Sequence, residues 1–343
     1  MTSQFIKSLY AKCKMHGTGD AQVILEDREL YALILLAFQD LEWSILEQNV
    51  LSVSFPSGSY YEIPLNWFDG EWGSKITPQD VLGLLDAGKQ RREDFILYIE
   101  NLCALHRRRV KYGRILATQP IPTMDQVGPR TLLEYGLCEP TLLAHWVIWR
   151  KWIYDIDNRA AQETGYVFEP ILATCLGGET IGAKNSPVKR IGEDGKPTSQ
   201  GRQIDCYIPT EKLACEFKLR VTIAASGQGR FKEELSFPEE CRAAGITPVL
   251  LVLDPTPSPR LAELSKKFLA CKGRFYQGDE AWEYMQQLAG ETISIFLNKY
   301  IRPVMMAMER IKIDDQGEIL FRWSEQGITV SQRNNSYTIL RQP

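Results

Sequence analysis

The residues best suited to chemistry in this sequence are Asp205, Glu216 and Lys218. They fall in the stretch GRQIDCYIPTEKLACEFKLRV, which otherwise has the apolar composition of buried strands. Two strands joined at the Pro-Thr-Glu-Lys turn predict a hairpin, and a hairpin can bring the two carboxylates together. Alternation along the second strand places Glu216 and Lys218 on one face, with Cys215 and Phe217 on the other.

Two carboxylates that face each other repel, so this pattern predicts a cation beside them. Mg²⁺ prefers hard oxygen ligands and keeps several of its waters, and a lysine beside a metal-bound water could orient or deprotonate it. Such a site is suited to hydrolysing a phosphodiester. The bare pattern is weak, because Glu-x-Lys on a strand is more often a solvent-facing surface. The loop residues Asp194 to Lys196 repeat its second half.

The composition, 44% hydrophobic and 24% charged residues, is that of a soluble globular protein. The 343 residues suffice for two modest domains or one large one. Because the net charge is −3, any binding of nucleic acid must depend on local clusters of basic residues and not on the charge of the whole chain. No apolar run is long enough to cross a membrane, and the N-terminus lacks the apolar core of a secretory signal, which predicts a cytoplasmic protein.

The cysteines and histidines narrow the possible chemistry. None of the eight cysteines forms a Cys-x-x-Cys pair, so a zinc ribbon or thioredoxin-like site is not supported and reduced structural thiols are expected. The chain has only three histidines, so catalytic mechanisms that need paired histidines are not favoured.

The first 150 residues are predicted to be mainly helical, with a hairpin over 50–65. Helices are expected over 20–50, 78–116 and 131–173, the last with possible breaks near Gly165 and Pro170. In HWVIWRKWIY, the side chains Trp146, Trp149 and Tyr154 are expected to fill a helix-packed core rather than to stack on bases.

Residues 177–203 are rich in Gly, Pro and Lys and predict loops. The order that follows is strand, strand, helix, strand, helix, strand, helix, in which ITPVLLVLDPT predicts a strand buried on both faces. This order predicts an α/β core with a mixed central β-sheet flanked by helices.

We divide the chain into a helical N-terminal region (1–150), a core (151–310) and a tail of short β-hairpins (311–343). The helical region either packs around the core or forms a separate lobe.

The stretch GRQIDCYIPTEKLACEFKLRVTIAASGQGRFKEELSFP, with PVLLVLDPT behind it, resembles the catalytic region of type II restriction endonucleases of the PD-(D/E)xK superfamily. It is most similar to the ApaLI-like family, over roughly residues 165–300. The resemblance implies a restriction-endonuclease-like core, with Asp205 and Glu216 as metal ligands and Lys218 as the catalytic lysine. The backbone carbonyl of Phe217 is implied as a further ligand.

One position in this motif departs from the superfamily pattern, and one acidic residue lies upstream of it. Ile204 stands where the superfamily has a proline before the aspartate, at a position that contributes no side-chain chemistry. Glu169, on an upstream helix, is implied as a supporting catalytic acid, and the alternative is a surface carboxylate beside Pro170.

The resemblance further implies Mg²⁺-dependent hydrolysis of double-stranded DNA at a six-base palindrome, with GTGCAC as the candidate sequence and 5′-phosphate ends. Because palindromic sites mirror two-fold protein symmetry, a homodimer is expected. A methyltransferase in the same cell would protect host DNA. Two alternatives stay open: a structure- or damage-specific nuclease of repair or recombination, and a non-catalytic DNA-binding protein.

Three segments are expected to contact DNA. HRRRVKYGR at 106–114 could bind phosphates, with a solvated helix surface as the alternative. NSPVKR at 185–190 is a second basic loop, and SGQGR at 226–230 is a loop whose glycines allow close approach and whose long side chains can read bases. The residues concerned are Arg107, Arg108, Arg109, Lys111, Lys189, Arg190, Ser226, Gln228 and Arg230.

Overall fold

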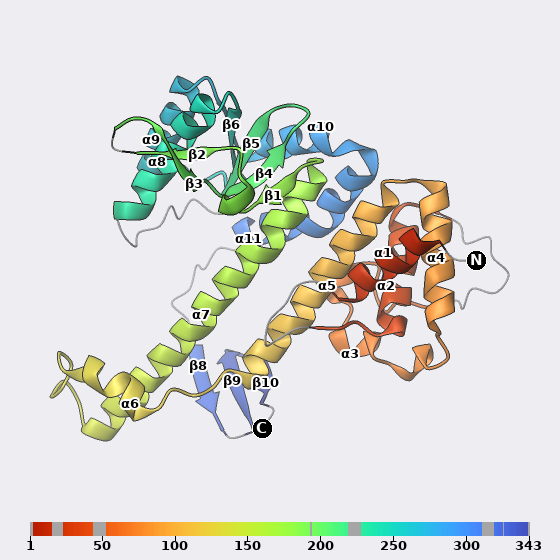
Figure 1. The fold of residues 1–343 in the computed structure, drawn as a ribbon. Coiled ribbons are helices and arrows are strands. Elements are labelled where there is room, and N and C mark those ends of the chain that lie inside the picture. Colours follow the sequence, from red (N-terminus) through yellow and green to blue (C-terminus); the bar gives the residue numbers. More distant parts are fainter. Residues whose placement is uncertain are drawn as a thin grey trace.

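The computed structural model describes residues 3–15, 23–43, 53–192, 194–218, 228–310, 319–324 and 326–341 (Figure 1). These residues form a five-stranded mixed sheet with helices on both faces, a helical N-terminal region, a two-stranded hairpin and a three-stranded C-terminal sheet. The prediction of an α/β fold with a mixed central sheet and a mainly helical N-terminal region is confirmed. Among the described helices, none combines the length and the apolar character needed to span a bilayer.

The central sheet has the strand order β1-β4-β5-β6-β7. Its strands are β1 (Glu179–Ile181), β4 (Ile204–Ile208), β5 (Leu213–Lys218), β6 (Thr247–Val252) and β7 (Arg274–Gln277). The first three pair antiparallel, whereas β5, β6 and β7 are parallel and are joined by the crossover helices α8 (Gln228–Ala243) and α9 (Pro259–Ala270). The apolar run in β6 is buried between its two neighbours, as its sequence predicts.

The two faces of the sheet pack into two separate cores. On one face, Cys215 and Phe217 pack with the N-terminal helices. On the other, Ala214 packs with Phe237 and Cys241 of α8. Because side chains alternate along a strand, the residues two and four positions after Ala214 lie on the α8 side of the sheet. These are the two charged residues of the predicted motif.

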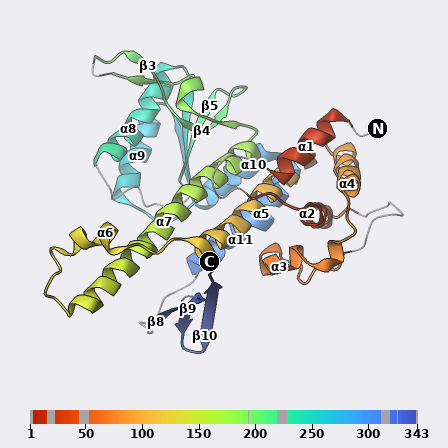
Figure 2. The same ribbon diagram turned by 60° about the horizontal axis from the view of Figure 1, so that its bottom comes forward.

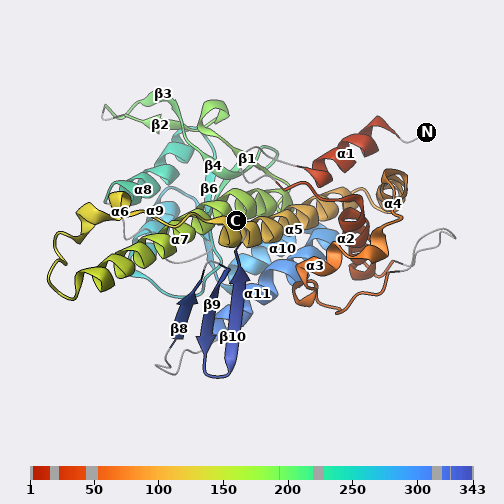
Figure 3. The same ribbon diagram turned by 90° about the horizontal axis from the view of Figure 1, so that it is seen from below.

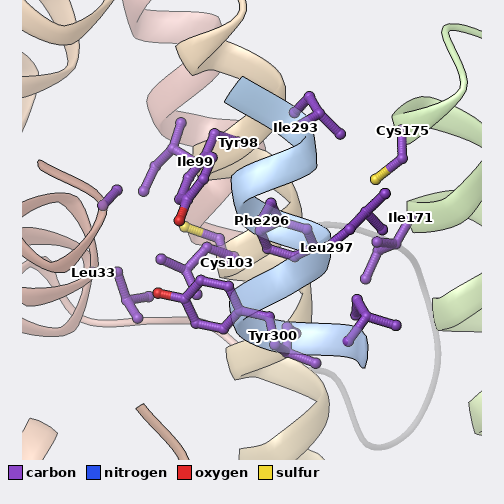
Figure 4. Close-up of a cluster of buried hydrophobic side chains, with 14 of the residues drawn as sticks. Leu33, Tyr98, Ile99, Cys103, Ile171, Cys175, Ile293, Phe296, Leu297 and Tyr300 are labelled. Atoms are coloured by element: carbon purple, nitrogen blue, oxygen red, sulfur yellow. The ribbon is translucent and has the colours of Figure 1, made fainter. Parts of the chain in front are cut away.

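The N-terminal region consists of α1 (Gln4–Lys14), α2 (Asp27–Asp40), η1 (Tyr60–Glu62), α3 (Leu65–Phe68), η2 (Glu71–Gly73), α4 (Pro78–Arg91), α5 (Phe95–Thr118), α6 (Met124–Val127) and η3 (Gly128–Thr131). Thr77 begins α4 with a capping box to Asp80, followed by proline in the first turn. One continuous hydrophobic core joins α1 to α5 with α7 (Pro140–Cys175), α10 (Asp279–Phe296) and the sheet. Figure 4 shows side chains of α2, α5, α7 and α10 meeting in this core. Because sheet residues such as Cys215 and Phe217 belong to the same core, the N-terminal helices pack around the sheet and do not form a separate lobe.

Within this core a buried carboxylate connects helices that are distant in sequence. Asp40 at the end of α2 accepts hydrogen bonds from the hydroxyls of Tyr98 and Tyr300, and it pairs with Lys299 at 2.8 Å. Burial and the charge of Asp40 raise the pKa of both tyrosines, which keeps them protonated donors.

Replacing Asp40 with Ala should lower the free energy of unfolding by about 3 kcal/mol, because two buried hydroxyls lose their acceptor. Denaturant unfolding of this variant measures the loss. The double replacement Tyr98→Phe with Tyr300→Phe in the Asp40→Ala background should recover part of it. A loss below about 0.5 kcal/mol would contradict the assigned role.

The hairpin predicted over 50–65 is wrong for the described residues, 53–65, which form no strand there but the short helix η1 and the start of α3. The alternation reflects packing of Tyr60 and Ile63 into the helical core. The backbone carbonyls of Tyr60, Tyr61 and Ile63 bond to the guanidinium of Arg109. A side chain from α5 therefore supplies the donors that a partner strand would have supplied.

The breaks considered near Gly165 and Pro170 do not occur, since α7 runs unbroken for 36 residues. An internal proline costs about 3 kcal/mol, and burial of Ile171, Leu172 and Cys175 against the sheet offsets it. Conversely, Thr131 does not begin this helix, because α7 starts at Pro140, where the Glu139 side chain accepts bonds from its first amides.

The expectation for the aromatic run on α7 is wrong for two of its residues. Trp146 and Tyr154 expose 54% and 58% of their surface. Trp149 is half-buried, but it packs against Phe321 and Trp323 of the C-terminal sheet rather than against another helix.

The remaining elements differ in detail from the sequence prediction. The segment expected to be loops over 177–203 contains β1, η4 (Ala183–Asn185) and a hairpin of β2 (Lys189–Ile191) and β3 (Pro197–Gly201). The single helix expected over 279–309 is divided into α10, the π-helix η5 (Leu297–Ile301) and α11 (Arg302–Arg310). The predicted tail hairpins are confirmed as β8 (Ile319–Trp323), β9 (Gly327–Gln332) and β10 (Asn335–Leu340).

All eight cysteines are free, and all but Cys138 are buried.

Candidate active site

The antiparallel β4–β5 hairpin brings the motif residues together. Cys206 pairs with Cys215 in this hairpin, so the register sets Asp205 opposite Glu216. Asp205 is buried, 8% exposed, and its Oδ2 accepts a hydrogen bond of 3.0 Å from the backbone amide of Phe217. The aspartate is thereby fixed across the strand that carries Glu216 and Lys218.

Lys218 is held between two carboxylates. Its Nζ lies 3.0 Å from Oε1 of Glu216 and 3.1 Å from Oε1 of Glu234. Burial alone would lower the pKa of Lys218, but the two carboxylates outweigh it and raise the pKa. Lys218 is therefore a protonated donor in this arrangement.

Glu234 belongs to this cluster although the sequence did not predict it. It lies on α8 three residues before Phe237 and seven before Cys241, both buried against the sheet. Residues at these spacings share one face of a helix. The sequence feature that could have predicted Glu234 is an acidic residue on the core-facing side of the expected helix, in FKEELSFPEEC.

Glu169 comes to the same cluster from α7, where it is half-buried. Burial and the charge of Glu216 raise its pKa. Burial, followed by the charges of Glu216 and Glu169, also raises the pKa of Asp205 well above its usual range. The structure thus gathers all four predicted catalytic residues, and their carboxylates repel one another.

The donor chemistry of this cluster fits a hard divalent cation. The carboxylates of Glu216 and Glu234 contact the Lys218 ammonium, the charges of Glu216 and Glu169 act on Asp205, and Oε2 of Glu234 is buried without a hydrogen-bond partner. In the described part of the chain, no three acidic, cysteine or histidine side chains converge closely enough to hold a metal ion by themselves. Mg²⁺ commonly takes one or two carboxylates together with waters and substrate phosphates, so two ligands suffice.

Replacing Glu234 with Gln should slow cleavage about 10- to 100-fold, since a residue that orients a catalytic group has effects of this size. The neutral amide keeps an acceptor for Lys218 but loses the charge. The matched control is Glu233→Gln, which changes the preceding, more exposed residue of the same helix. Equal rates for the two variants would remove Glu234 from the site.

The predicted DNA contacts lie in several places. Lys189 and Arg190 are on β2 rather than in a loop, and Arg190 pairs with Glu233 at 3.3 Å, one residue from Glu234. Arg202, at the end of β3, also donates to the carbonyl of Glu233 at 2.6 Å. The β2–β3 hairpin is therefore attached to the helix that reaches the carboxylates.

The segment SGQGR is only partly described. Ser226 lies outside the described residues. The loop prediction is wrong for Gln228 and Arg230, because both belong to the first turn of α8. Base reading by these residues stays a prediction, now from the start of a helix.

The basic cluster on α5 contacts the N-terminal region. Arg107 donates to the carbonyls of Lys12 and Cys13, and Arg109 donates to three carbonyls around η1 at 2.8 to 3.1 Å. Arg108 stacks on Tyr112 in the same helix, which also carries Lys111. All three arginines thus have partners within the chain, and contact of this cluster with DNA stays a prediction.

Arg109→Ala should lower the free energy of unfolding by about 2–3 kcal/mol, because a charged donor to three carbonyls is lost. The salt dependence of DNA binding should stay unchanged. Denaturant unfolding and binding at several salt concentrations test the two parts. If the slope of the logarithm of the DNA-binding constant against the logarithm of salt concentration instead flattened by about one unit, Arg109 would be a phosphate contact.

The sequence of this chain matches those of known proteins. The sequence model described as ApaLI-like restriction endonuclease matches residues 76–302. The type II restriction enzyme ApaLI of Acetobacter pasteurianus is 44% identical over 293 residues, 83% of this chain and 77% of that protein. No solved structure matches the chain.

The class is therefore that of restriction endonucleases, enzymes that act as site-specific deoxyribonucleases. Within that class, the chain belongs to the ApaLI-like restriction endonuclease family. The family match begins at residue 76 and so extends further toward the N-terminus than the resemblance over roughly 165–300, into the helical region.

Proposed function

We propose that this chain cuts both strands of double-stranded DNA at a palindrome of six base pairs, with Mg²⁺ as cofactor and 5′-phosphate ends as products. The observation that carries the proposal is the cluster of Asp205, Glu216 and Lys218 on one face of the sheet. It occurs in a chain that belongs to a restriction endonuclease family.

Asp205 and Glu216 would hold the metal, with the backbone carbonyl of Phe217 as a further ligand. When bound, Mg²⁺ supplies charge neutralisation at the phosphate and an acidified water. The oxygens of these residues are hard donors, and their mutual repulsion in the absence of a cation favours binding one.

The other residues of the cluster position groups for the reaction. Glu216 and Glu234 hold the Lys218 ammonium within 3.1 Å, so its donors are oriented before DNA arrives. The ammonium would donate to the attacking water or to the phosphate oxygens as negative charge develops on them. Glu169 adds a negative charge at the cluster that favours the cation.

Recognition would use the surroundings of this cluster. Lys189 and Arg190 on β2 would contact phosphates, and Gln228 and Arg230 at the start of α8 would reach base edges. A homodimer would present two clusters related by the symmetry of the site. Host DNA would need protection by a methyltransferase of the same specificity.

Digestion of a plasmid with one GTGCAC site, in Mg²⁺ and in chelator, tests the proposal when the ends are mapped by sequencing. We expect double-strand cuts at one fixed six-base palindrome, with ligatable 5′-phosphates. Cuts at junctions, ends or lesions would instead indicate a repair nuclease. Binding without any cutting would indicate a non-catalytic DNA-binding protein.

A further inference from the structure

The first half of α7 and the segment before it carry an apolar surface on the outside of the molecule. We call residues 124–155 the arm. In Figures 1, 2 and 3, α6 and the first turns of α7 lie at the end of that helix remote from the central sheet. The large apolar side chains of the arm expose 46 to 93% of their surface: Met124, Leu132, Leu133, Tyr135, Leu137, Leu142, Trp146, Ile153 and Tyr154.

One side of the arm helix is already packed. Leu143 and Val147 form a small core with Val127 of α6, and this core fixes α6 on α7. The exposed side chains Leu142, Trp146 and Ile153 follow each other at spacings of four and seven residues, so they form a stripe along a different face.

The exposed apolar side chains of the whole arm cover more area than an ordinary monomer surface exposes in one patch. Apolar patches on monomers are roughly 300–600 Å², and a single aromatic side chain can bury about 150–250 Å². Nine large side chains exposed to this extent approach the ~800 Å² per partner of a standard interface. Exposed apolar area of this size is typical of a surface that binds another protein.

The charges on the arm indicate which partner fits. Arg150 forms a bidentate pair with Glu134 at 2.6 and 3.1 Å, and Lys151 pairs with Asp155. The other two carboxylates of the arm also have partners within the chain, since Glu139 accepts from the first amides of α7 and Asp125 accepts from the hydroxyl of Thr123. A surface whose charges are compensated within the chain can meet an identical surface without repulsion, and it offers little to a polyanion.

We infer that the arm is the dimer interface, and that its partner is the same arm of a second copy of this chain. This inference deepens the proposed function, because it supplies the two-fold symmetry that a palindromic site demands. The proposed function also determines the direction of pairing, through the position of Glu169 further along the same helix.

At 1.5 Å per residue, Glu169 lies about 30 Å along α7 from the middle of the stripe. Antiparallel arms would place the two Glu169 residues roughly 60 Å apart, whereas six base pairs span only about 20 Å. Parallel arms place both at the same end of the helix pair, beside each other. The two copies of α7 therefore pair in parallel, with Leu142 and Trp146 each facing its own symmetry mate.

Sedimentation velocity over a range of protein concentrations tests the interface. The wild-type chain should sediment as a dimer at low and at high salt. Trp146→Glu should weaken self-association at least ~30-fold, as expected for a central aromatic residue. Leu133→Glu serves as a second variant because Leu133 is 93% exposed and not needed for packing. Leu269→Glu, at a residue 56% exposed on α9, is the matched control and should stay dimeric.

Disulfide formation tests the direction of pairing. In a Cys138→Ser background, Leu142→Cys alone should give a covalent dimer on oxidation, because parallel arms bring the two copies within reach of a disulfide. Cross-linking only between chains carrying Leu142→Cys and chains carrying Ile153→Cys would overturn the parallel arrangement. A wild-type monomer, or a dimer unaffected by both Glu variants, would overturn the interface. If the interface is overturned but the protein still cuts DNA at a mapped site, the proposed function stands. If the dimer depends on the arm but the protein cuts no DNA, only the proposed function is refuted.

Discussion

Asp205→Asn should abolish DNA cleavage, with a fall of at least ~10³-fold in the single-turnover rate at saturating DNA and Mg²⁺. The amide is nearly isosteric and can still accept the hydrogen bond from the Phe217 amide, so the strand geometry survives. What is lost is the charge that would hold the metal. DNA binding measured without metal should stay within a few-fold of the wild type.

The stability of this variant separates loss of chemistry from loss of folding. Burial and the charges of Glu216 and Glu169 destabilise the ionised form of Asp205, so neutralising it should leave the free energy of unfolding unchanged or raise it. Asp194→Asn, in the exposed β2–β3 turn, is the matched control and should cut normally. Cleavage by Asp205→Asn at near the wild-type rate would end the assignment of this residue to the site.

The second large effect concerns Lys218→Ala, for which we expect the single-turnover rate to fall by about 10²- to 10⁴-fold. The ammonium acts on the attacking water and the transition state, so affinity for DNA should change little. A nearly unchanged rate with weakened affinity would make Lys218 a phosphate contact and refute the proposed mechanism. Lys189→Ala is the matched control, because Lys189 lies on β2, outside the carboxylate cluster, and should affect affinity alone.

The residues that could be predicted are those whose environment is local or periodic. The β4–β5 hairpin follows from its alternation and turn, and the same pairing sets Asp205 opposite Glu216. The doubly buried strand β6 follows from its continuous apolar run. In both cases the local hydrophobic pattern agrees with the tertiary environment of the strand. The sequence alone was therefore enough to predict these two elements.

The errors arise where tertiary contacts decide. Nothing local to residues 53–65 shows that Arg109, from a helix 46 residues further on, will occupy their carbonyls. Glu234 reaches Lys218 only because a crossover helix packs over the sheet, and its role in the site depends on that packing. Trp146 resembles a core residue in sequence, and its exposure follows from the position of the arm beyond the other helices.

The central claim is that the carboxylates of the β4–β5 hairpin form a metal-dependent active site for phosphodiester hydrolysis. The most direct test is single-turnover cleavage of a GTGCAC duplex by the wild-type chain across a Mg²⁺ titration, with DNA binding followed in the same samples. We expect no cleavage in chelator, saturable activation by Mg²⁺, and DNA binding that persists throughout the titration. Cleavage that continues at full rate in excess chelator would contradict the central claim.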